Sequence, residues 1–414
     1  MDQVHKAGKG DAVAADDSTV PSDLWDADNH YYEPRDCFTR YIEPAMADRA
    51  IRVSTDDDGR EAVLVGDRPF TFLLDPFRET TSKPGSLREM LRAMSSGDVK
   101  ESAVIEPIQP EYVNRDARLA LMDTQGVEAI LLFPTLAVCV EHFMQDDPEQ
   151  LFANVHAFNR WLDDDWGFDY QDRIFGVPLL SLRDVDRAVI ELEFVLARGA
   201  RAISLRPGPA FGRSPADPHF DPFWARVNEA GVAVCFHIGE SGYNELYSTA
   251  WGEAANPSSH HQSAFQWTSF YGDRPIMDTF SALVLHNLFG RFPNVQCISV
   301  ENGSLYVPYL LKAMNKMNGM GRNGPWLGGR ITERPSDIFK RHVSVSPYHE
   351  EDVVALAGLI GDDRVLFGSD YPHAEGLAEP RDFAETIDTL SPDAINRIMR
   401  DNLRGLLCDT TVAS

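Results

Sequence analysis

The chain has 414 residues, of which 43% are hydrophobic and 10% aromatic, which is enough for one large barrel or for two ordinary domains. Its formal net charge of −26 argues against nucleic acid and anionic membranes as partners, because phosphate binding needs clustered Lys and Arg. No apolar run reaches the length of about 18 residues that a membrane-spanning helix needs.

The first segment, residues 1–21, is polar and rich in small side chains, without the apolar stretch of a secretory signal. We predict that it is a disordered tail and that residues 22–410 form one domain. The five cysteines are odd in number and show no CxxC spacing, which is typical of packing residues. These features together predict a cytoplasmic protein.

Short apolar runs of strand length alternate with amphipathic stretches over most of the chain. The predicted strands cover residues 24–28, 128–133, 173–180, 200–205, 231–236, 295–300, 342–345 and 364–367. Helices are predicted over 148–165, 184–197, 275–289 and 391–402, the last with Ser391 as N-cap. This alternation predicts parallel strands joined by helices, and eight strands predict an α/β fold, the (β/α)8 TIM barrel.

Two regions interrupt the alternation. Residues 34–118 follow the first strand, and we predict an insertion that caps the barrel mouth, with a hairpin over 51–72 around Asp58-Gly59. Residues 240–273 form a long loop after the fifth strand, and structureless loops of that length are usually functional or disordered. The predicted barrel is therefore distorted.

The end of the first strand carries several possible ligands. Asp28 and His30 point the same way because alternate residues of a strand share a face, and Asp26 would share that direction deeper in the barrel. Glu33 lies just beyond the strand end. The alternative for this stretch is an acidic strand end in solvent.

Three later strands are also followed by polar residues. His237 comes after the fifth strand, Glu301 after the sixth, and Asp370 after the eighth in Phe-Gly-Ser-Asp-Tyr-Pro-His. A carboxylate at the edge of a core costs free energy unless it is hydrogen-bonded or coordinated. Each residue alone has an ordinary explanation, a semi-buried histidine or a turn aspartate. Together, at the ends of barrel strands, they predict a metal-dependent enzyme.

The order Asp-x-His, His, Glu and Ser-Asp-Tyr-Pro-His resembles the amidohydrolase-related family, the second amidohydrolase group, which includes aminocarboxymuconate-semialdehyde decarboxylase-like enzymes. The segments Gly-Ala-Arg-Ala-Ile at 199–203 and Leu-Phe-Gly-Arg-Phe-Pro at 288–293 add to this resemblance. It implies a distorted TIM barrel with metal at its C-terminal mouth. His30, His237 and Asp370 match the ligands that the family takes from the first, fifth and eighth strands.

Two positions depart from the family pattern, because Asp28 replaces the first His of His-x-His and Glu301 stands where a catalytic His is usual. The resulting set is rich in oxygen ligands and predicts two divalent ions, with Fe or Mn at least as suitable as Zn. The predicted metal ligands are Asp28, His30, Glu33, His237, Glu301 and Asp370, with His261 or its neighbour His260 as a further candidate from the long loop. Surface histidines are the alternative for that pair.

Further residues are candidates for contacts with a substrate. The resemblance implies that His373 bonds the substrate or supports the ligands, and Arg206 would bind a substrate carboxylate or else pair with one of the abundant acids. The aromatic residues that would line an apolar pocket, or simply pack, are Tyr31, Trp251, Phe265, Trp267 and Trp326.

These residues leave three functions open. The first is metal-assisted hydrolysis or non-oxidative decarboxylation of a small-to-medium organic substrate, with Asp370 transferring protons and Glu301 bridging the ions or acting as base. The second is a non-haem di-iron monooxygenase, because the carboxylate-rich set resembles the barrel-type enzyme of platensimycin-type diterpenoid biosynthesis. That resemblance implies hydroxylation of a bulky terpenoid or acyl-thioester substrate with O₂. The third is non-catalytic, a barrel with a structural metal or one that has lost its activity. A homodimer is a further possibility.

Overall fold

The computed structural model describes residues 20–56, 58–59, 61–73, 76–77, 79–96, 104–270 and 274–408. Two parallel sheets form its centre, with strand orders β1-β7-β8 and β12-β11-β10-β9. Their strands are β1 (Leu24–Tyr31), β7 (Val127–Pro134), β8 (Ile174–Gly176), β9 (Ala202–Ser204), β10 (Ala233–His237), β11 (Cys297–Val300) and β12 (Val343–Val345). Each of the first seven predicted strands overlaps one of these. Most of the predicted tail, residues 1–19, lies outside the described residues.

Backbone hydrogen bonds join the two sheets into a ring. After β8, Leu180 N donates to Ser204 O of β9 at 2.9 Å. On the other side, Leu366 N donates to Val345 O of β12 at 2.9 Å, and Ala27 N of β1 donates to Phe367 O at 2.8 Å. The segment around residue 366 therefore occupies the eighth position, as the TIM-barrel prediction requires.

The eighth position is less regular than the sequence predicts. Residues 364–367 form only an isolated parallel bridge between Val345 and Val365. The reason is visible at Phe367, whose N–H donates to Ile398 O at 3.1 Å instead of to a neighbouring strand. A helical segment thus accepts a hydrogen bond that a neighbouring strand accepts in a regular sheet. Residues 364–367 therefore stay extended without becoming a full strand.

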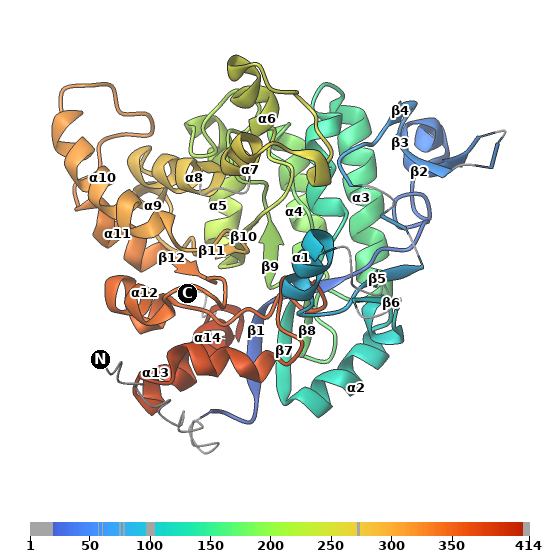
Figure 1. Ribbon diagram of the computed structural model, residues 1–414. Helices are drawn as coiled ribbons and strands as arrows, with labels where there is room; N and C mark the ends of the chain where they lie inside the picture. Colours follow the sequence, from blue (N-terminus) through green and yellow to red (C-terminus); the bar gives the residue numbers. More distant parts are fainter. Residues whose placement is uncertain are drawn as a thin grey trace, which may run out of the picture.

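Helices surround this ring of strands (Figure 1). Those between and after the barrel strands are α2 (Arg115–Gln125), α3 (Pro148–Asp165), α4 (Val185–Leu196), α5 (Asp221–Ala230), α8 (Arg274–Leu285), α9 (Leu288–Arg291), α10 (Tyr306–Met320), α11 (Pro335–His342), α12 (Val353–Ile360), α13 (Pro392–Asn396) and α14 (Asn402–Cys408). The predicted helix 148–165 matches α3 at both ends. Ser391 caps α13 as predicted, since its side chain accepts from Ala394 N.

The insertion after β1 contains the predicted hairpin. Its strands and helix are β2 (Ile51–Thr55), β3 (Glu61–Val65), β4 (Arg68–Pro69), β5 (Thr80–Ser82), α1 (Leu87–Ser96) and β6 (Ile105–Pro107). The strands β2 and β3 pair antiparallel, with Thr55 opposite Glu61. The insertion also reaches the segment after the eighth position, because Leu87 N donates to Ala374 O at 2.9 Å.

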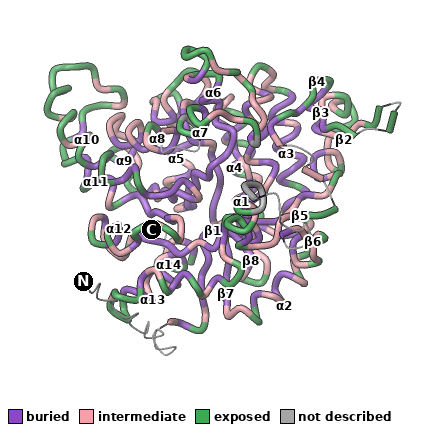
Figure 2. The backbone as a smooth tube through the Cα atoms, viewed as in Figure 1, coloured by how far each residue is buried: buried purple, intermediate pink, exposed green. Residues whose placement is uncertain are grey.

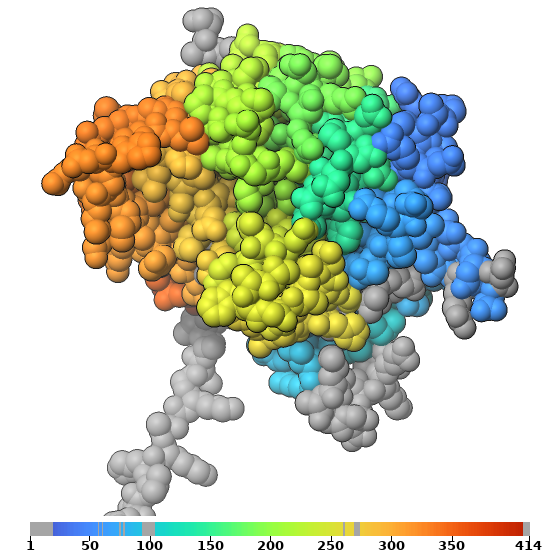
Figure 3. Space-filling model, turned by 90° about the horizontal axis from the view of Figure 1, so that it is seen from above, coloured from blue at the N-terminus to red at the C-terminus, as the bar shows by residue number. Residues whose placement is uncertain are grey.

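The long loop after β10 carries two short helices, α6 (Tyr243–Leu246) and α7 (Ala264–Phe270). Ser259 N of this loop donates to Phe72 O of the insertion at 2.8 Å. Seen from above, the loop in yellow and the insertion in blue lie side by side at one end of the molecule (Figure 3).

The core has an inner and an outer part, and buried segments occupy the centre of the backbone trace (Figure 2). A smaller cluster, including Ala129, Cys235 and Ile298, lies inside the ring of strands, and a larger one fills the space between strands and helices. Among the described helices, none combines the length and apolar character needed to cross a membrane.

Candidate metal centre

A β-bulge in β1 aims Asp28 and His30 into the barrel. Trp25 pairs with Ala129 and His30 with Phe133, so five steps along β1 match four steps along β7. The extra residue falls between Asp26 and Asn29, where the register shifts. A bulge of this kind changes which face a side chain occupies. Before the bulge, Trp25 points inward and belongs to the inner core cluster. After the bulge, the even-numbered residues Asp28 and His30 point inward instead.

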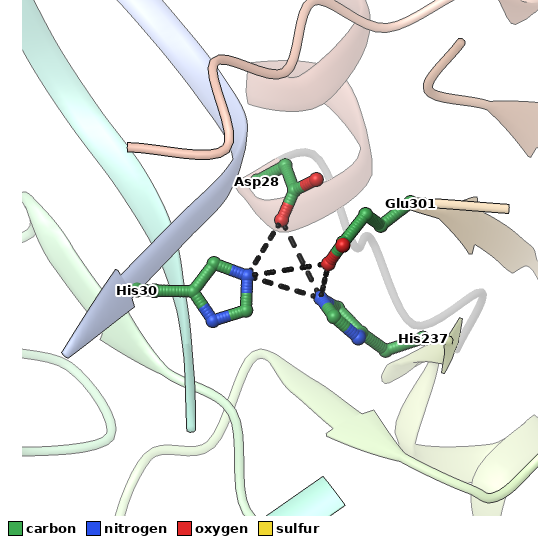
Figure 4. Close-up of side chains that lie close together, drawn as sticks. All are labelled: Asp28, His30, His237 and Glu301. Atoms are coloured by element: carbon green, nitrogen blue, oxygen red, sulfur yellow. Dashed lines mark hydrogen bonds and ion pairs between the residues drawn. The ribbon is translucent and has the colours of Figure 1, made fainter. Parts of the chain in front are cut away.

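His237 and Glu301 approach these two residues from the ends of β10 and β11 (Figure 4). His237 Nε2 lies 3.2 Å from His30 Nε2 and 3.2 Å from Glu301 Oε2. Asp28 Oδ1 lies 3.3 Å from His30 Nε2 and 3.5 Å from His237 Nε2. One ligand atom from each of the four residues lies within 4.8 Å of the others. The structure therefore brings these predicted residues together.

Asp370 and His373 lie beside this group. Asp370 Oδ1 is 3.5 Å from His30 Nε2 and 2.7 Å from His373 Nδ1. The other ring nitrogen of His373, Nε2, is 3.2 Å from Thr135 Oγ1. With His30 and Glu301, the two residues make a second group of possible ligands within the same 4.8 Å limit.

Accessibility differs between the two groups. The side chains of His30, His237 and Asp28 are 1%, 2% and 5% exposed, whereas those of Glu301, Asp370 and His373 are 11%, 12% and 15% exposed. The first three are therefore enclosed, and a molecule from solvent would meet Glu301 and the Asp370–His373 pair first.

Burial and crowding of charges shift the titration of the cluster. Burial raises the pKa of Glu301 to about 7, and burial together with the charges of Glu301 and Asp28 raises the pKa of Asp370 well above its usual range. Burial also lowers the pKa of His30 to about 4. Burial alone would raise the pKa of Asp28, but the adjacent imidazoles of His237 and His30 hold that pKa well below its usual range. His30 is therefore a neutral imidazole at neutral pH, among crowded carboxylates.

This donor set fits a divalent metal ion. Asp28 Oδ1 is buried and has no hydrogen-bond partner within the described part of the chain. A buried carboxylate oxygen without a donor is costly, and a cation among the crowded carboxylates would remove that cost. Two imidazole nitrogens with two carboxylates are ligands that Zn, Mn and Fe all accept.

A hydrogen-bond network behind the cluster fixes the backbone that carries its ligands. Asp26 Oδ1 accepts from Ser369 N at 2.9 Å and from Asp28 N at 3.1 Å, while Oδ2 accepts from Ser369 Oγ at 2.5 Å and from Asn29 Nδ2 at 2.9 Å. Burial raises the pKa of Asp26 to about 7, and the hydrogen bonds from Ser369 and Asp28 oppose that shift. The prediction that Asp26 shares the direction of Asp28 is wrong, because the bulge separates them.

A buried arginine completes this network. Arg118 is 1% exposed and donates to Asn29 Oδ1, to His30 O at 2.7 Å and to Glu111 O at 2.8 Å. Sequence reasoning missed Arg118 because it is one of many charged residues on a helix. Its one signal is its place on the buried side of α2, beside Leu119 and Met122.

The structure does not bring Glu33 or His261 to the cluster. Glu33 is buried, but its carboxylate accepts from Leu136 N at 2.9 and 3.1 Å and from Ala137 N at 2.9 Å. It lies two residues past the end of β1, where the chain has left the sheet and turned towards the loop after β7. His261 is exposed and belongs to neither group of possible ligands. The side chain of His260 lies outside the described residues.

The other predicted contact residues are scattered. Arg206 pairs with Glu141 at 3.4 Å and donates to Ser241 O at 2.6 Å. It therefore pairs with an acid, which is the alternative to binding a substrate carboxylate. Of the aromatic residues, Tyr31 is fully buried, and Trp251, Phe265 and Trp267 are exposed.

The sequence pattern of the amidohydrolase family matches residues 108–407, which is well over half of the chain. The chain belongs to the amidohydrolase family. No curated protein matches it significantly. An amidohydrolase from Mycobacterium avium subsp. paratuberculosis K-10 of known structure is 39% identical, with a TM-score of 0.83, over 93% of this chain and 99% of the other.

Two decarboxylases of known structure are more distant. The 5-carboxyvanillate decarboxylase from Sphingomonas paucimobilis is 20% identical, with a TM-score of 0.56, over 73% of this chain and 87% of its own. A dihydroxybenzoic acid decarboxylase from Polaromonas sp. JS666, with bound manganese and the inhibitor 2-nitroresorcinol, is also 20% identical with a TM-score of 0.56, over 76% and 92%. At this level of identity, the two matches show only that the three chains share a fold.

Proposed function

We propose that this chain is a metal-dependent hydrolase or lyase that cleaves a small-to-medium organic substrate beside the group Asp28, His30, His237 and Glu301. The observation that carries the proposal is the convergence of four ligand atoms within 4.8 Å at the ends of three barrel strands. Polar residues at the C-terminal ends of barrel strands are where TIM-barrel enzymes hold their reacting groups.

The Asp370–His373 pair supplies the proton transfer. The contact of 2.7 Å between Asp370 Oδ1 and His373 Nδ1 orients the imidazole and leaves its Nε2 beside Thr135. A divalent ion, when bound, polarises a substrate oxygen and offsets the negative charge that develops on it. Glu301 belongs to both groups of possible ligands, so its negative charge would lie next to the ion and next to the pair.

Two reactions use this arrangement. In decarboxylation, the bond between the carboxyl carbon and its neighbour breaks, CO₂ leaves, and the remaining carbon takes a proton from the pair. In hydrolysis, the pair takes a proton from a water that adds to the acyl carbon, and returns it to the leaving group. Both need one proton donor and acceptor beside the metal ligands and within reach of a substrate, and the 15% exposed side chain of His373 meets this need.

The comparisons support this class of function. The family is that of amidohydrolases, and similar structures include decarboxylases of hydroxylated aromatic acids, two of them with bound manganese. Mn²⁺ is therefore the first ion to test, before Zn²⁺ and Fe²⁺. The di-iron monooxygenase alternative gains no support from these structures, and the homodimer and the cytoplasmic location stay predictions.

The number of ions depends on whether Asp370 and His373 act as ligands of a second ion or as a proton-transfer pair. The sequence favours two ions, and the second would use Asp370 and His373 with the shared residues His30 and Glu301. The contact of 2.7 Å between Asp370 Oδ1 and His373 Nδ1 leaves the second oxygen and the second ring nitrogen available, so it fits either role. We propose one ion held by Asp28, His30, His237 and Glu301, with the pair beside it, because these four ligands are enough for one ion.

Elemental analysis of protein purified without added metal tests the proposal first. We expect about one Mn, Zn or Fe per chain, lost in His237→Ala and kept in Asp67→Asn, a change at an exposed turn. A panel of aromatic and aliphatic carboxylic acids assayed for CO₂ release, and of esters and amides assayed for acid release, then separates lyase from hydrolase. A folded wild-type protein that binds no divalent ion would overturn the proposal, and two irons with O₂ uptake would favour the monooxygenase.

A further inference from the structure

A cavity of about 370 Å³ lies between the barrel and the insertion. The barrel contributes Tyr32, Thr135 and Leu136 to its wall, and the insertion contributes Phe77, Ile108 and Val113. The volume falls within the range of small-molecule sites, and at about 30 Å³ for each water-sized group it has room for roughly a dozen non-hydrogen atoms.

Two wall residues of the cavity connect it to His373 of the proton-transfer pair. Thr135 Oγ1 lies 3.2 Å from His373 Nε2 and is fixed by donating to Tyr31 O at 2.8 Å. The ring of Tyr32 packs at a tilt beside that of His373, with centroids 6.1 Å apart. Two wall residues thus contact the histidine that lies on the accessible side of the proposed metal centre.

The walls favour an uncharged occupant. Leu73, Phe77, Ile108, Val113 and Leu136 supply apolar surface. The buried polar groups in the wall already have partners. Glu33 accepts from the amides of residues 136 and 137, and Tyr32 Oη accepts from Thr81 Oγ1 at 2.7 Å. An anionic tail would meet Glu33 and Glu79 in a chain of net charge −26, and the cation in the wall, Arg35, is already paired with Glu61 at 2.7 Å.

Most of the wall residues precede residue 108, where the match to the family pattern begins. The cavity is therefore built mainly by a part of the chain that the family pattern does not describe. A pocket of this origin, next to a shared centre, is suited to setting substrate choice.

We infer that this cavity binds the apolar body of the substrate, an aromatic or branched alkyl group of roughly a dozen non-hydrogen atoms, while its carboxyl or acyl group lies at the metal centre. This assignment rests on the proposed function. It makes Phe77, Ile108 and Val113 determinants of specificity and gives the predicted cap a role in substrate binding.

The test uses 2-naphthoate as probe and acetate as its small counterpart, titrated into Mn²⁺-loaded protein by calorimetry. Each buried carbon raises affinity about fourfold, so burying only three of the nine additional carbons makes 2-naphthoate bind at least about 60-fold more tightly than acetate. In Val113→Trp, where the indole enters the cavity, the two affinities should converge. Val113 is 47% exposed, so the larger side chain meets no tightly packed core. The matched control is Ile190→Trp, at a 67% exposed position on α4 that does not line this cavity.

Two further readouts separate failure of this inference from failure of the proposed function. Proton relaxation of bound 2-naphthoate should be faster with paramagnetic Mn²⁺ than with Zn²⁺, because the probe lies next to the ion. The neutral analogue 2-naphthylmethanol tests the cavity in metal-free protein. If the ion binds but Val113→Trp leaves 2-naphthoate affinity unchanged, the cavity assignment is wrong and the proposed function stands. If no ion binds but Val113→Trp still abolishes binding of the alcohol, the cavity is a binding site and the proposed function fails.

Discussion

Asp26→Asn tests whether the network behind the cluster sets the geometry of the ligands. Asp26 Oδ1 accepts from two backbone amides, those of Asp28 and Ser369, so the amide oxygen of the new Asn must take that place. Its NH₂ group then faces Ser369 Oγ and Asn29 Nδ2, which donate to Asp26 Oδ2 at 2.5 and 2.9 Å in the wild type. The Ser369 hydroxyl can rotate, accept from the new NH₂ group and donate to Asp28 O, 3.4 Å away, but the Asn29 amide cannot adapt in this way. Asn29 cannot turn over, because its Oδ1 accepts from the buried Arg118. The substitution therefore sets two donors against each other.

The expected cost follows from that single mismatch. One buried donor without an acceptor costs about 1–3 kcal/mol of unfolding free energy. Asn29 lies between Asp28 and His30, so the displacement also moves two of the proposed ligands. Losing the support behind a ligand typically weakens metal binding about 10–100-fold.

Two measurements at pH 8, where Asp26 is ionised, check these figures. Urea unfolding with a chelator gives the stability of the metal-free protein, and calorimetric titration of Mn²⁺ gives its affinity. Asp67→Asn makes the same chemical change at an exposed turn and should alter neither. The reasoning is refuted if Asp26→Asn keeps both its unfolding free energy, to within about 0.5 kcal/mol, and its Mn²⁺ affinity, since a surface substitution does no more than that.

Three other substitutions address the centre directly. His237→Ala removes an imidazole of the enclosed group, and the stabilisation that Mn²⁺ gives at 100 times its Kd, about 2.7 kcal/mol by thermal unfolding, should disappear. His373→Ala should lower kcat about 10²–10⁴-fold with unchanged metal content by elemental analysis, and loss of one ion per chain would instead make it a ligand. Gly368→Ala places a Cβ 2.3 Å from Ser346 Oγ and 2.8 Å from Asp28 Cβ. We therefore expect the unfolding free energy, measured in urea, to fall by about 1–3 kcal/mol. Calorimetry should show weaker Mn²⁺ binding. Wild-type stability in that variant would show that the strand can shift without cost.

The sequence was sufficient for the parts of this fold that depend on local pattern. Helical periodicity with a proline at the start defines α3 at both ends, and Asp58-Gly59 between two β-prone runs indicates the hairpin. Polar residues directly after buried strands identify most of the cluster, because the end of a parallel strand has a fixed place at the barrel mouth. His237 and Glu301 are found this way without any knowledge of tertiary contacts.

The residues whose positions the sequence pattern does not predict are held by tertiary contacts. The bulge in β1 adds one residue and thereby turns Asp26 away from Asp28, and no residue type in that stretch specifies a bulge. Glu33 meets two backbone amides after β7, at a sequence separation of 103 and 104 residues, so its partners are invisible to a local pattern. Arg118 reaches Asn29 across a separation of 89 residues and looks like an ordinary helix arginine. Patterns of charge cannot locate such contacts.

The backbone at two of the proposed site residues indicates how the fold holds them. Glu301 and Asp370 both have φ of +54°, a left-handed conformation that costs a residue with a side chain about 1–3 kcal/mol. Hydrogen bonds hold each turn in place. Tyr348 Oη donates to Glu301 O at 2.8 Å, Asn302 Nδ2 donates to Val300 O at 2.8 Å, and Asp370 N donates to Asp28 O at 2.8 Å. Glycine would adopt these angles more easily but would remove the carboxylates. Here glutamate and aspartate occupy such turns and face buried imidazoles. This pattern is expected where stability is traded for a binding site.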